Sequence, residues 1–248
     1  MRDARSANSP PMLFPAPLVR GTLVQRYKRF FADVALDDGT HVTAHCPNPG
    51  AMLGLKTPGM PVWLSRSTDP KRKLGWTLEL VEACGGLVGV NTMNPNKLAW
   101  EAIAQNRIPE LTGYARMRRE VAYDGDSRID ILLEHDDRPP CWVEVKNSHF
   151  LREPGLAEFP DCVTVRGVKH LKALERRVEA GERAVMLFCV QVTGVTEFDT
   201  ADDIDKGYGP ALREAAANGV EVIVYGCALG AEGIHIDRPM RWRGAPGG

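Results

Sequence analysis

Several features that would point to other protein classes are missing from this chain of 248 residues. No apolar run reaches the roughly 18–20 residues that a bilayer-spanning helix needs, so we expect no membrane partner. Neither of the Gly-rich spacings that cradle nucleotide phosphates is present, which argues against a sugar-metabolising enzyme. The six cysteines form no Cys-x-x-Cys pair, and most lie in apolar segments typical of buried, reduced thiols. These absences favour a cytoplasmic protein.

The two ends of the chain carry little that could fold. Residues 1–11 contain two arginines and a Pro-Pro pair but no apolar stretch like that of a secretory signal. We therefore expect a disordered extension over 1–11, with Met12 as a candidate start of the protein. The Gly- and Pro-rich end predicts a flexible tail over 241–248.

Charge is nearly balanced over the whole chain, with a formal net charge of −1, but it is unevenly distributed. Residues 1–85 hold 11 Lys and Arg against 7 Asp and Glu, whereas the remainder holds 20 against 25. A basic part beside an acidic, metal-capable part fits a binding module joined to a nuclease-like module.

Residues 12–91 predict an all-β domain. Short apolar segments are separated there by turn sequences such as Asp38-Gly39 and Pro58-Gly59. We expect strands over 18–26, 30–36, 41–46, 61–65, 76–81 and 87–90. Five or six short strands in a segment of this length indicate a small barrel, such as an OB-fold.

Cations and aromatic rings are interleaved at the edges of this expected barrel. A protein that binds single strands or the nucleic-acid backbone needs cations that contact the phosphates and aromatic rings that stack on the bases. The candidates are Arg26, Tyr27, Lys28, Arg29, Arg66, Lys71, Arg72 and Lys73. The three adjacent cations at 71–73 favour binding, because they repel one another unless an anion arrives. For the rings, packing into the barrel is an equally open alternative.

Residues 92–240 predict a mixed α/β domain. Helices are expected over 95–106, 166–180 and 208–217, and strands over 116–123, 128–133, 141–147, 184–190 and 220–226. Strand 184–190 is apolar throughout, which predicts burial on both of its faces. The order, αβββαβ followed by a further helix and strand, indicates an α/β sandwich.

Asp130, Glu144 and Lys146 are the most informative residues of the chain. Asp130 lies on one predicted strand, and Glu144 and Lys146 lie on the next. Because alternate residues of a strand share a face, Glu144 and Lys146 project together, and a short connection can bring Asp130 against them. Two carboxylates and an ammonium suit a Mg²⁺ (or Mn²⁺) site that hydrolyses phosphodiesters. The alternative, a solvated surface strand, fits poorly with the apolar neighbours of Glu144.

This order of elements and acids resembles the PD-(D/E)XK nuclease fold. The resemblance implies that Asp130 and Glu144 bind the metal and that Lys146 assists the attacking water. Some members of that superfamily add a glutamate from the first helix, for which Glu101 is the tentative candidate. Others place a basic or amide group on the helix after the third strand, and the candidates there are Arg166, Lys169 and His170.

Nearly the whole chain from Met12 also resembles the bacterial and archaeal sugar fermentation stimulation protein A family. The strings that carry the likeness are Leu-Val-Arg-Gly-Thr-Leu (18–23), Arg-Tyr-Lys-Arg-Phe (26–30), Thr-Ala-His-Cys-Pro-Asn (43–48), Pro-Lys-Arg-Lys-Leu (70–74), Ser-Arg-Ile-Asp (127–130), Val-Glu-Val-Lys-Asn (143–147) and the stretch 157–171. The resemblance implies an OB-fold-like domain followed by a nuclease-like domain. It also implies DNA binding with weak sequence preference and a link to regulation of sugar (maltose) metabolism.

Two hypotheses about activity stay open at this point. The first is a DNA-binding protein with an active Mg²⁺-dependent nuclease site, which the complete set of Asp130, Glu144 and Lys146 favours. The second is a non-catalytic DNA-binding regulator, which the family phenotype favours. No base-reading motif distinguishes DNA from RNA as the partner. Many nucleases of this fold act as dimers, so a homodimer is also an open alternative.

Overall fold

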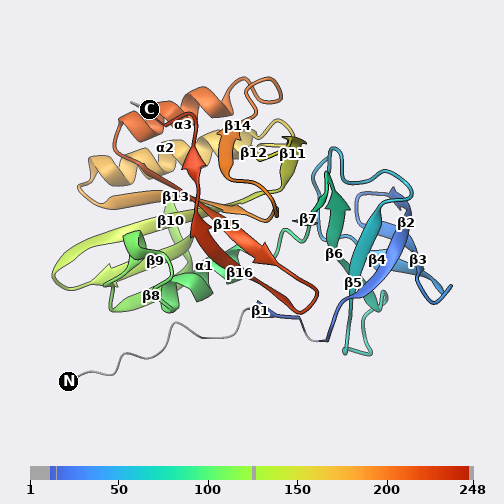
Figure 1. Cartoon of the computed structure of the whole chain (residues 1–248). Coiled ribbons are helices and arrows are strands. Elements are labelled where there is room, and N and C mark those ends of the chain that lie inside the picture. The colour runs from blue at the N-terminus through green and yellow to red at the C-terminus, as the bar shows by residue number, and fades with distance from the viewer. Residues whose placement is uncertain (1–11, 15, 125–126, 246–248) are drawn as a thin grey trace.

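The computed structural model describes residues 12–14, 16–124 and 127–245, with the backbone alone at Asp124 (Figure 1). The expected disordered extension over 1–11 lies outside the described residues, as do the last three residues of the expected tail. A small β-barrel forms one side of the molecule and a larger α/β unit forms the other. The predicted fold class, a barrel followed by a nuclease-like α/β domain, is confirmed.

The first domain contains six strands, the first five of which close into a barrel: β2 (Val19–Tyr27), β3 (Phe31–Leu36), β4 (His41–His45), β5 (Pro61–Arg66), β6 (Trp76–Ala83) and β7 (Gly86–Gly89). Their order is β4-β3-β2-β5-β6-β7, and an additional parallel pairing of β4 with β6 closes the barrel. Antiparallel neighbours with one parallel closure make the five-stranded barrel of an OB-fold. Burial alternates along β3, so every second side chain fills the barrel core.

The second domain is built on a sheet of seven strands in the order β1-β16-β15-β13-β10-β9-β8. Their bounds are β1 (Met12–Leu13), β8 (Arg116–Asp124), β9 (Ser127–His135), β10 (Arg138–Ser148), β13 (Arg183–Val190), β15 (Glu221–Leu229) and β16 (Gly233–Pro239). Its helices are α1 (Pro95–Ala104), α2 (Val165–Glu179) and α3 (Tyr208–Ala217), with a 3-10 turn at Pro109–Leu111.

Strand β13 is buried on both faces, as its sequence predicts. Met186 and Phe188 pack with the residues of α2 and α3, whereas Val185 and Leu187 pack with those of α1. The helices therefore cover opposite faces of the sheet (Figure 1). The neighbouring strand β10 pairs in parallel with β13 and antiparallel with β9, so it is a central strand.

A second, smaller sheet was not predicted from the sequence. It consists of β11 (Phe150–Glu153), β12 (Leu156–Phe159), β14 (Glu197–Thr200) and β17 (Arg241–Trp242). These strands are very short, and only β11 and β12 are neighbours in the chain, whereas β14 and β17 pair with distant segments. No local pattern therefore identifies the sheet. The last one also corrects the expected tail over 241–248, because Trp242 is buried in the main core.

The two domains meet along a hydrogen-bonded seam. Val88 of β7 forms a bridge with Val192, and the Gly89 N–H donates to the Gln191 carbonyl at 2.8 Å. The Thr193 N–H donates a hydrogen bond to the Leu87 carbonyl at 2.9 Å. One apolar cluster also runs from the barrel into the α/β domain. The barrel is therefore fixed against the second domain.

Replacing Gly86 by alanine tests this seam. A Cβ at Gly86 would lie 2.9 Å from the Thr193 carbonyl oxygen and 2.7 Å from Thr193 Oγ1, so the two segments must move apart. We expect Gly86→Ala to lower the free energy of unfolding by about 1–3 kcal/mol, as overpacking does, in a chemical denaturation experiment. Gly75→Ala is the matched control, because a Cβ there meets nothing within 4 Å. Equal stability of the two variants would contradict a tightly packed seam.

Candidate functional site

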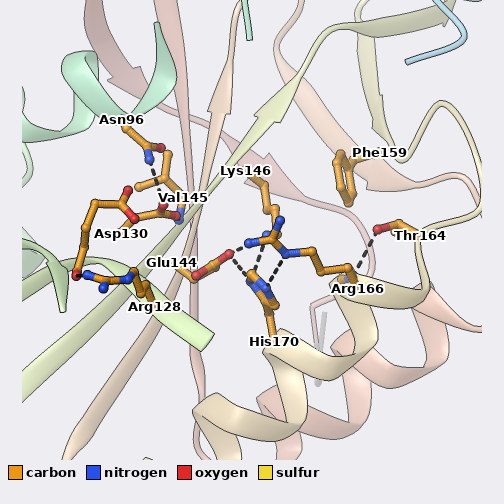
Figure 2. Close-up of a pocket in the computed structure, with 12 residues that line it drawn as sticks. Asn96, Arg128, Asp130, Glu144, Val145, Lys146, Phe159, Thr164, Arg166 and His170 are labelled. Atoms are coloured by element: carbon orange, nitrogen blue, oxygen red, sulfur yellow. Dashed lines mark hydrogen bonds and ion pairs between the residues drawn. The ribbon is translucent and has the colours of Figure 1, made fainter. Parts of the chain in front are cut away.

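The predicted acids lie in a pocket of about 310 Å³ between the sheet and two helices (Figure 2). Strands β8, β9 and β10 provide its floor, and α1 and α2 provide its sides. The polar and charged residues that line it are Asn96, Glu120, Arg128, Asp130, Glu144, Lys146, Thr164, Arg166 and His170. Sequence segments separated by many residues therefore converge on one small volume.

Strand pairing brings the two carboxylates together. The ladder between β10 and β9 ends at the pair Val143 and Ile131, so Glu144 and Asp130, the residues just beyond this pair, occupy opposite positions, and both line the pocket. Lys146 projects from the same side as Glu144, and its Nζ lies 2.5 Å from Glu144 Oε1. The geometric part of the sequence hypothesis, that Asp130, Glu144 and Lys146 share one patch of sheet, thus agrees with the structure.

Glu144 is the most deeply buried of these groups, with only 2% of its surface exposed. Burial alone would raise the pKa of its carboxyl. The hydrogen bond from His170 and the charge of Lys146 outweigh that effect, and the pKa is lowered. Both partners bind Oε1, while Oε2 is buried and has no hydrogen-bond partner among the described residues. A buried carboxylate oxygen without a donor lacks one favourable interaction.

Asp130 is held by two donors but is electrostatically unfavourable as an anion. Its Oδ1 accepts from Asn96 Nδ2 at 2.7 Å, and its Oδ2 accepts from the Val145 N–H at 2.8 Å. Burial and the neighbouring charge of Glu144 nevertheless raise its pKa to about 6. The pair of acids therefore carries more negative charge than its surroundings neutralise.

This donor set fits a hard divalent cation. Two carboxylates face each other, one buried oxygen has no partner, and oxygen donors are what Mg²⁺ and Mn²⁺ prefer. Among the residues that the structure describes, no group of three or more His, Cys, Asp or Glu forms a metal cluster. The protein side chains would thus supply two carboxylates, and water or substrate oxygens would complete the coordination.

His170, predicted with Arg166 and Lys169 as a basic group that would meet a phosphate, contacts the acid pair directly. It is 5% exposed, and its Nδ1 contacts Glu144 Oε1. Arg166 Nε donates to His170 Nε2 at 3.1 Å, so the ring proton lies on Nδ1 and points to Glu144. Arg166 itself lines the pocket, whereas Lys169 is exposed and outside the lining. His170 therefore orients Glu144 from the first turns of α2.

Glu101 lies away from the acid pair, in contrast to its tentative assignment as a metal ligand. Its Oε1 accepts from Gln105, and it is not among the residues that line the pocket. Asn96 is the residue of α1 that reaches Asp130. At about 100° of rotation per helical residue, positions 96 and 101 project in different directions, so only one of them can face the sheet.

Glu120 and Arg128 line the pocket but were not among the predicted site residues. Arg119 pairs with Ile131 and Val121 with Ile129, which places Glu120 opposite Asp130 at the mouth of the pocket. Glu120 has a φ of 52°, a left-handed conformation that non-glycine residues adopt at a cost. Arg128 Nη1 donates to the Glu120 carbonyl at 2.8 Å and supports this conformation. Pairing the predicted strands residue by residue would have found Glu120.

The candidate nucleic-acid-binding residues of the barrel divide into three groups. Arg26 is partly buried and donates to the carbonyls of Asn48 and Gly50, so it holds a loop and does not present a free cation. Tyr27 stacks on Phe31. The remaining residues are exposed: Lys28 and Arg29 lie in the β2–β3 turn, Arg66 and Arg72 line a second groove, and Lys71 and Lys73 lie outside that groove.

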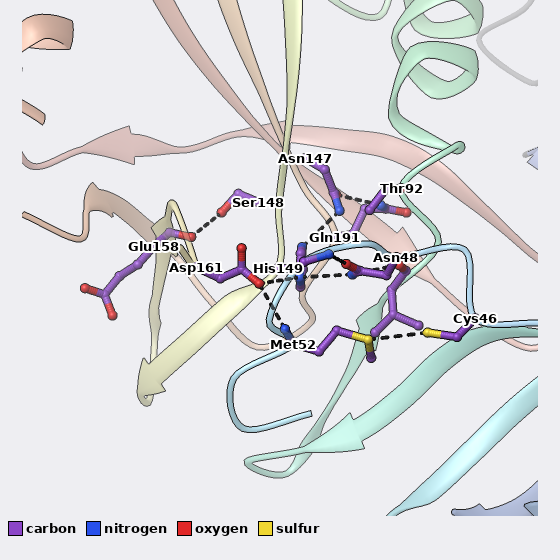
Figure 3. Close-up of polar contacts among 12 residues, drawn as sticks. Cys46, Asn48, Met52, Thr92, Asn147, Ser148, His149, Glu158, Asp161 and Gln191 are labelled. Atoms are coloured by element: carbon purple, nitrogen blue, oxygen red, sulfur yellow. Dashed lines mark hydrogen bonds and ion pairs between the residues drawn. The ribbon is translucent and has the colours of Figure 1, made fainter. Parts of the chain in front are cut away.

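A buried polar network connects the barrel to the strand that carries Lys146 (Figure 3). Asn48 of the barrel lies 3.3 Å from His149 Nε2, and Asn147 Nδ2 lies 3.0 Å from His149 Nδ1. Asp161 faces His149 at 3.7 Å and accepts from the Met52 N–H at 3.1 Å. Burial would raise the pKa of Asp161, but His149 outweighs that effect and the pKa is lowered. The network fixes the end of β10 relative to the barrel.

Comparisons with known proteins agree with this two-part organisation. The family model "Sugar fermentation stimulation protein RE domain" matches residues 93–233, and the "SfsA N-terminal OB domain" model matches residues 24–90. Homologues called sugar fermentation stimulation protein are 59% identical in Maricaulis maris and 54% identical in Caulobacter vibrioides. They cover 93% of this chain and 98% and 97% of their own lengths, respectively.

A solved structure, that of Pyrococcus furiosus SfsA in complex with Ca²⁺, is 26% identical with a TM-score of 0.84. The alignment covers 95% of this chain and 100% of that one. Within the described residues, the helices are too short or too polar to cross a membrane.

The repulsion between the two acids predicts an unusual response to neutralising Asp130. The Asp130 pKa is raised from 3.8 to about 6, so the folded parent should lose stability as pH rises from about 4 to about 6. In the Asp130→Asn variant the new side chain cannot ionise, and Asn96 can turn its amide to keep both hydrogen bonds. In the presence of a chelator at pH 8, we expect the free energy of unfolding of Asp130→Asn to exceed that of the parent by on the order of 1–3 kcal/mol, which raises the unfolding temperature.

Thermal unfolding between pH 4 and pH 8 measures this difference. The stability difference between Asp130→Asn and the parent should grow as pH rises from about 4 to about 6 and should stay constant at higher pH. Glu101→Gln serves as the control, because it removes a carboxylate from α1 outside the pocket. A less stable Asp130→Asn protein at pH 8 would contradict the proposed repulsion.

Proposed function

The chain belongs to the sugar fermentation stimulation protein family, and we propose that it is a DNA-binding protein whose second domain hydrolyses phosphodiester bonds with a divalent cation. The observation that carries this proposal is the acid pair. Glu144 and Asp130 face each other in a pocket, and Glu144 Oε2 is buried without a partner among the described residues. Such a site is stabilised by a cation that binds both carboxylates.

Asp130 and Glu144 would hold Mg²⁺ or Mn²⁺. When bound, the cation supplies charge to the phosphoryl oxygens and makes a water molecule more acidic. The Ca²⁺ complex of the Pyrococcus furiosus relative supports a divalent cation as the ligand of this family. Asn96 and the Val145 N–H keep the Asp130 carboxylate oriented, and His170 does the same for Glu144.

Lys146 is placed to act on the attacking water. Its ammonium lies between Glu144 and the open volume of the pocket, and its side chain is 17% exposed. With its remaining N–H groups, the ammonium would donate to a water or to a phosphate oxygen in the pocket. The residue thereby orients the nucleophile in the pocket.

Arg166 and Arg128 are the groups available for the substrate phosphate. Both are exposed and line the pocket from opposite sides, one on α2 and the other on β9. Arg166 lies in the first turn of α2, where backbone N–H groups and the helix dipole also favour an anion. A phosphodiester between these two side chains would have its phosphorus beside the acid pair.

The barrel supports a nucleic acid as the substrate. In OB-folds, the loops between strands 1 and 2 and between strands 4 and 5 contact oligonucleotides. The corresponding segments here are the β2–β3 turn with Lys28 and Arg29 and the β5–β6 connection with Arg72. Contacts of this type go to phosphates and give little sequence preference. The same chemistry accepts RNA, and the link to sugar metabolism follows from the family alone.

Cleavage assays with purified protein test this function. We expect labelled single-stranded, duplex or branched DNA to be cut with Mg²⁺ or Mn²⁺ and to stay intact in EDTA. Asp130→Asn removes one metal-binding charge and should lower the cleavage rate by at least about 100-fold, since electrostatic stabilisation in the transition state is lost.

Glu101→Gln is the matched control, because the same loss of one carboxylate occurs outside the pocket. It should cut at the parental rate. Cleavage by Asp130→Asn as fast as by the parent would overturn the assignment of the site. If the protein binds the substrates but cleaves none of them, it is a non-catalytic DNA-binding regulator.

A further inference from the structure

We infer that a single strand of nucleic acid lies in a continuous groove that begins on the barrel and ends at the acid pair. This inference deepens the proposed function and rests on it for the chemistry at the end of the groove. Three neighbouring depressions make up the path, with volumes of about 540, 300 and 310 Å³. We call them the barrel segment, the middle segment and the acid pocket.

The three depressions are connected by shared lining residues. Met93 and Lys97 line both the barrel segment and the middle segment. Asn96, Glu120 and Asp130 line both the middle segment and the acid pocket. The N-terminal end of α1 is therefore the link between the barrel and the site, and a polymer can follow it without leaving the surface.

Cations occur along the whole path. Arg66 and Arg72 line the barrel segment, and Lys97 lies where that segment meets the middle one. Arg128 and Arg166 then line the acid pocket. A row of separated positive charges matches the repeating phosphates of a polynucleotide better than it matches one small anion.

Asn94 supplies an independent indication of a ligand. Its side chain is buried, with 4% of the residue exposed, and it lines the barrel segment. It makes no capping hydrogen bond to α1, and its Nδ2 has no hydrogen-bond partner among the described residues. A buried amide donor without an acceptor is costly, and a phosphate or base oxygen in the groove would satisfy it.

Bases also find partners in the barrel segment. His45 lines it and is stacked on Phe30, a ring that is 43% exposed, and Met93 is 65% exposed at the junction. Rings and thioethers of this kind pack against base faces whatever the sequence. The buried acid of this segment, Glu79, accepts from Ser65 Oγ and Asn91 Nδ2, so its charge is already compensated by donors.

The dimensions of the path favour a single strand over a duplex. Each depression has the volume of a small-ligand pocket, far less than a duplex would fill. Glu144 lies at the end of the path with 2% exposure, so the reacting phosphate must enter the pocket. One backbone with its bases turned aside can do so, whereas the second backbone of a duplex would remain outside.

Binding of fluorescent oligonucleotides to the full chain tests the path. The Asp130→Asn protein in EDTA is used so that the strand stays uncut. Fluorescence anisotropy reports the affinity for thymidine strands of about 4–16 nucleotides, which is the length that one OB-fold binds. Adding Arg66→Ala with Arg72→Ala to this protein should weaken binding at least about 10-fold. It should also reduce the salt slope by about 1.4, the value for two phosphate contacts on a single strand.

Lys71→Ala with Lys73→Ala is the matched control. It removes two cations from the loop that carries Arg72, but neither of them lines the groove. Its affinity should stay within about 3-fold of that of the Asp130→Asn protein without these changes, and its salt slope should not change. Equal weakening by the two double variants would overturn the groove in favour of diffuse attraction to the loop.

Asn94→Ala separates hydrogen bonding from charge. The helix does not depend on this side chain for its cap, so α1 should stay intact. We expect single-strand affinity to fall by about 3–10-fold, the range for one hydrogen bond, with an unchanged salt slope. Unaltered affinity of this variant would remove the barrel segment from the binding site.

Strand length tests whether the path reaches the acid pair. Long strands should bind more tightly to Asp130→Asn than to the parent in EDTA, because a negative charge at the end of the path is removed. Short strands should bind both proteins equally. Tighter binding of duplex than of single strands would overturn the inference. Parental protein that binds through the groove but cuts nothing would leave the groove supported and the proposed hydrolysis refuted.

Discussion

The burial of the Glu144 carboxylate at the centre of the sheet is the constraint on which the site depends. A charge in this position is tolerated only with compensation, and Lys146 and His170 supply part of it through one oxygen. Asp130 on the neighbouring strand adds a second negative charge instead of relieving the first. The two carboxylates therefore lower the stability of the fold locally, and a cation bound between them would relieve this repulsion.

The arrangement of the domains determines what can reach this pocket. β7 is bonded to the segment after β13, and the network around His149 joins the barrel to the end of β10. Because these contacts are backbone bonds and buried polar bonds, the barrel keeps one position relative to Lys146. The groove between the two domains is consequently a fixed surface, lined by cations from both and by the first residues of α1.

Much of the site was predictable because strands have a simple period. The spacing of Glu144 and Lys146 places them on one face of β10. The neighbouring strand β9 places Asp130 opposite them. The helical candidates were less certain. Glu101 on α1 was expected to reach the metal, but Asn96 is the residue of that helix that contacts Asp130. On α2, His170 is buried against Glu144. Helix rotation is fixed by packing against the sheet, which composition does not reveal.

The sequence by itself determined the main strands and helices, the barrel class and the identity of the acid pair, since these follow from local periodicity and strand alternation. Only the tertiary structure decided the second small sheet, the burial of Trp242 and the place of Glu120 opposite Asp130. These features depend on contacts between residues far apart in the chain. For the same reason, the continuity of the groove from Arg66 to Asp130 emerges only when both domains are assembled.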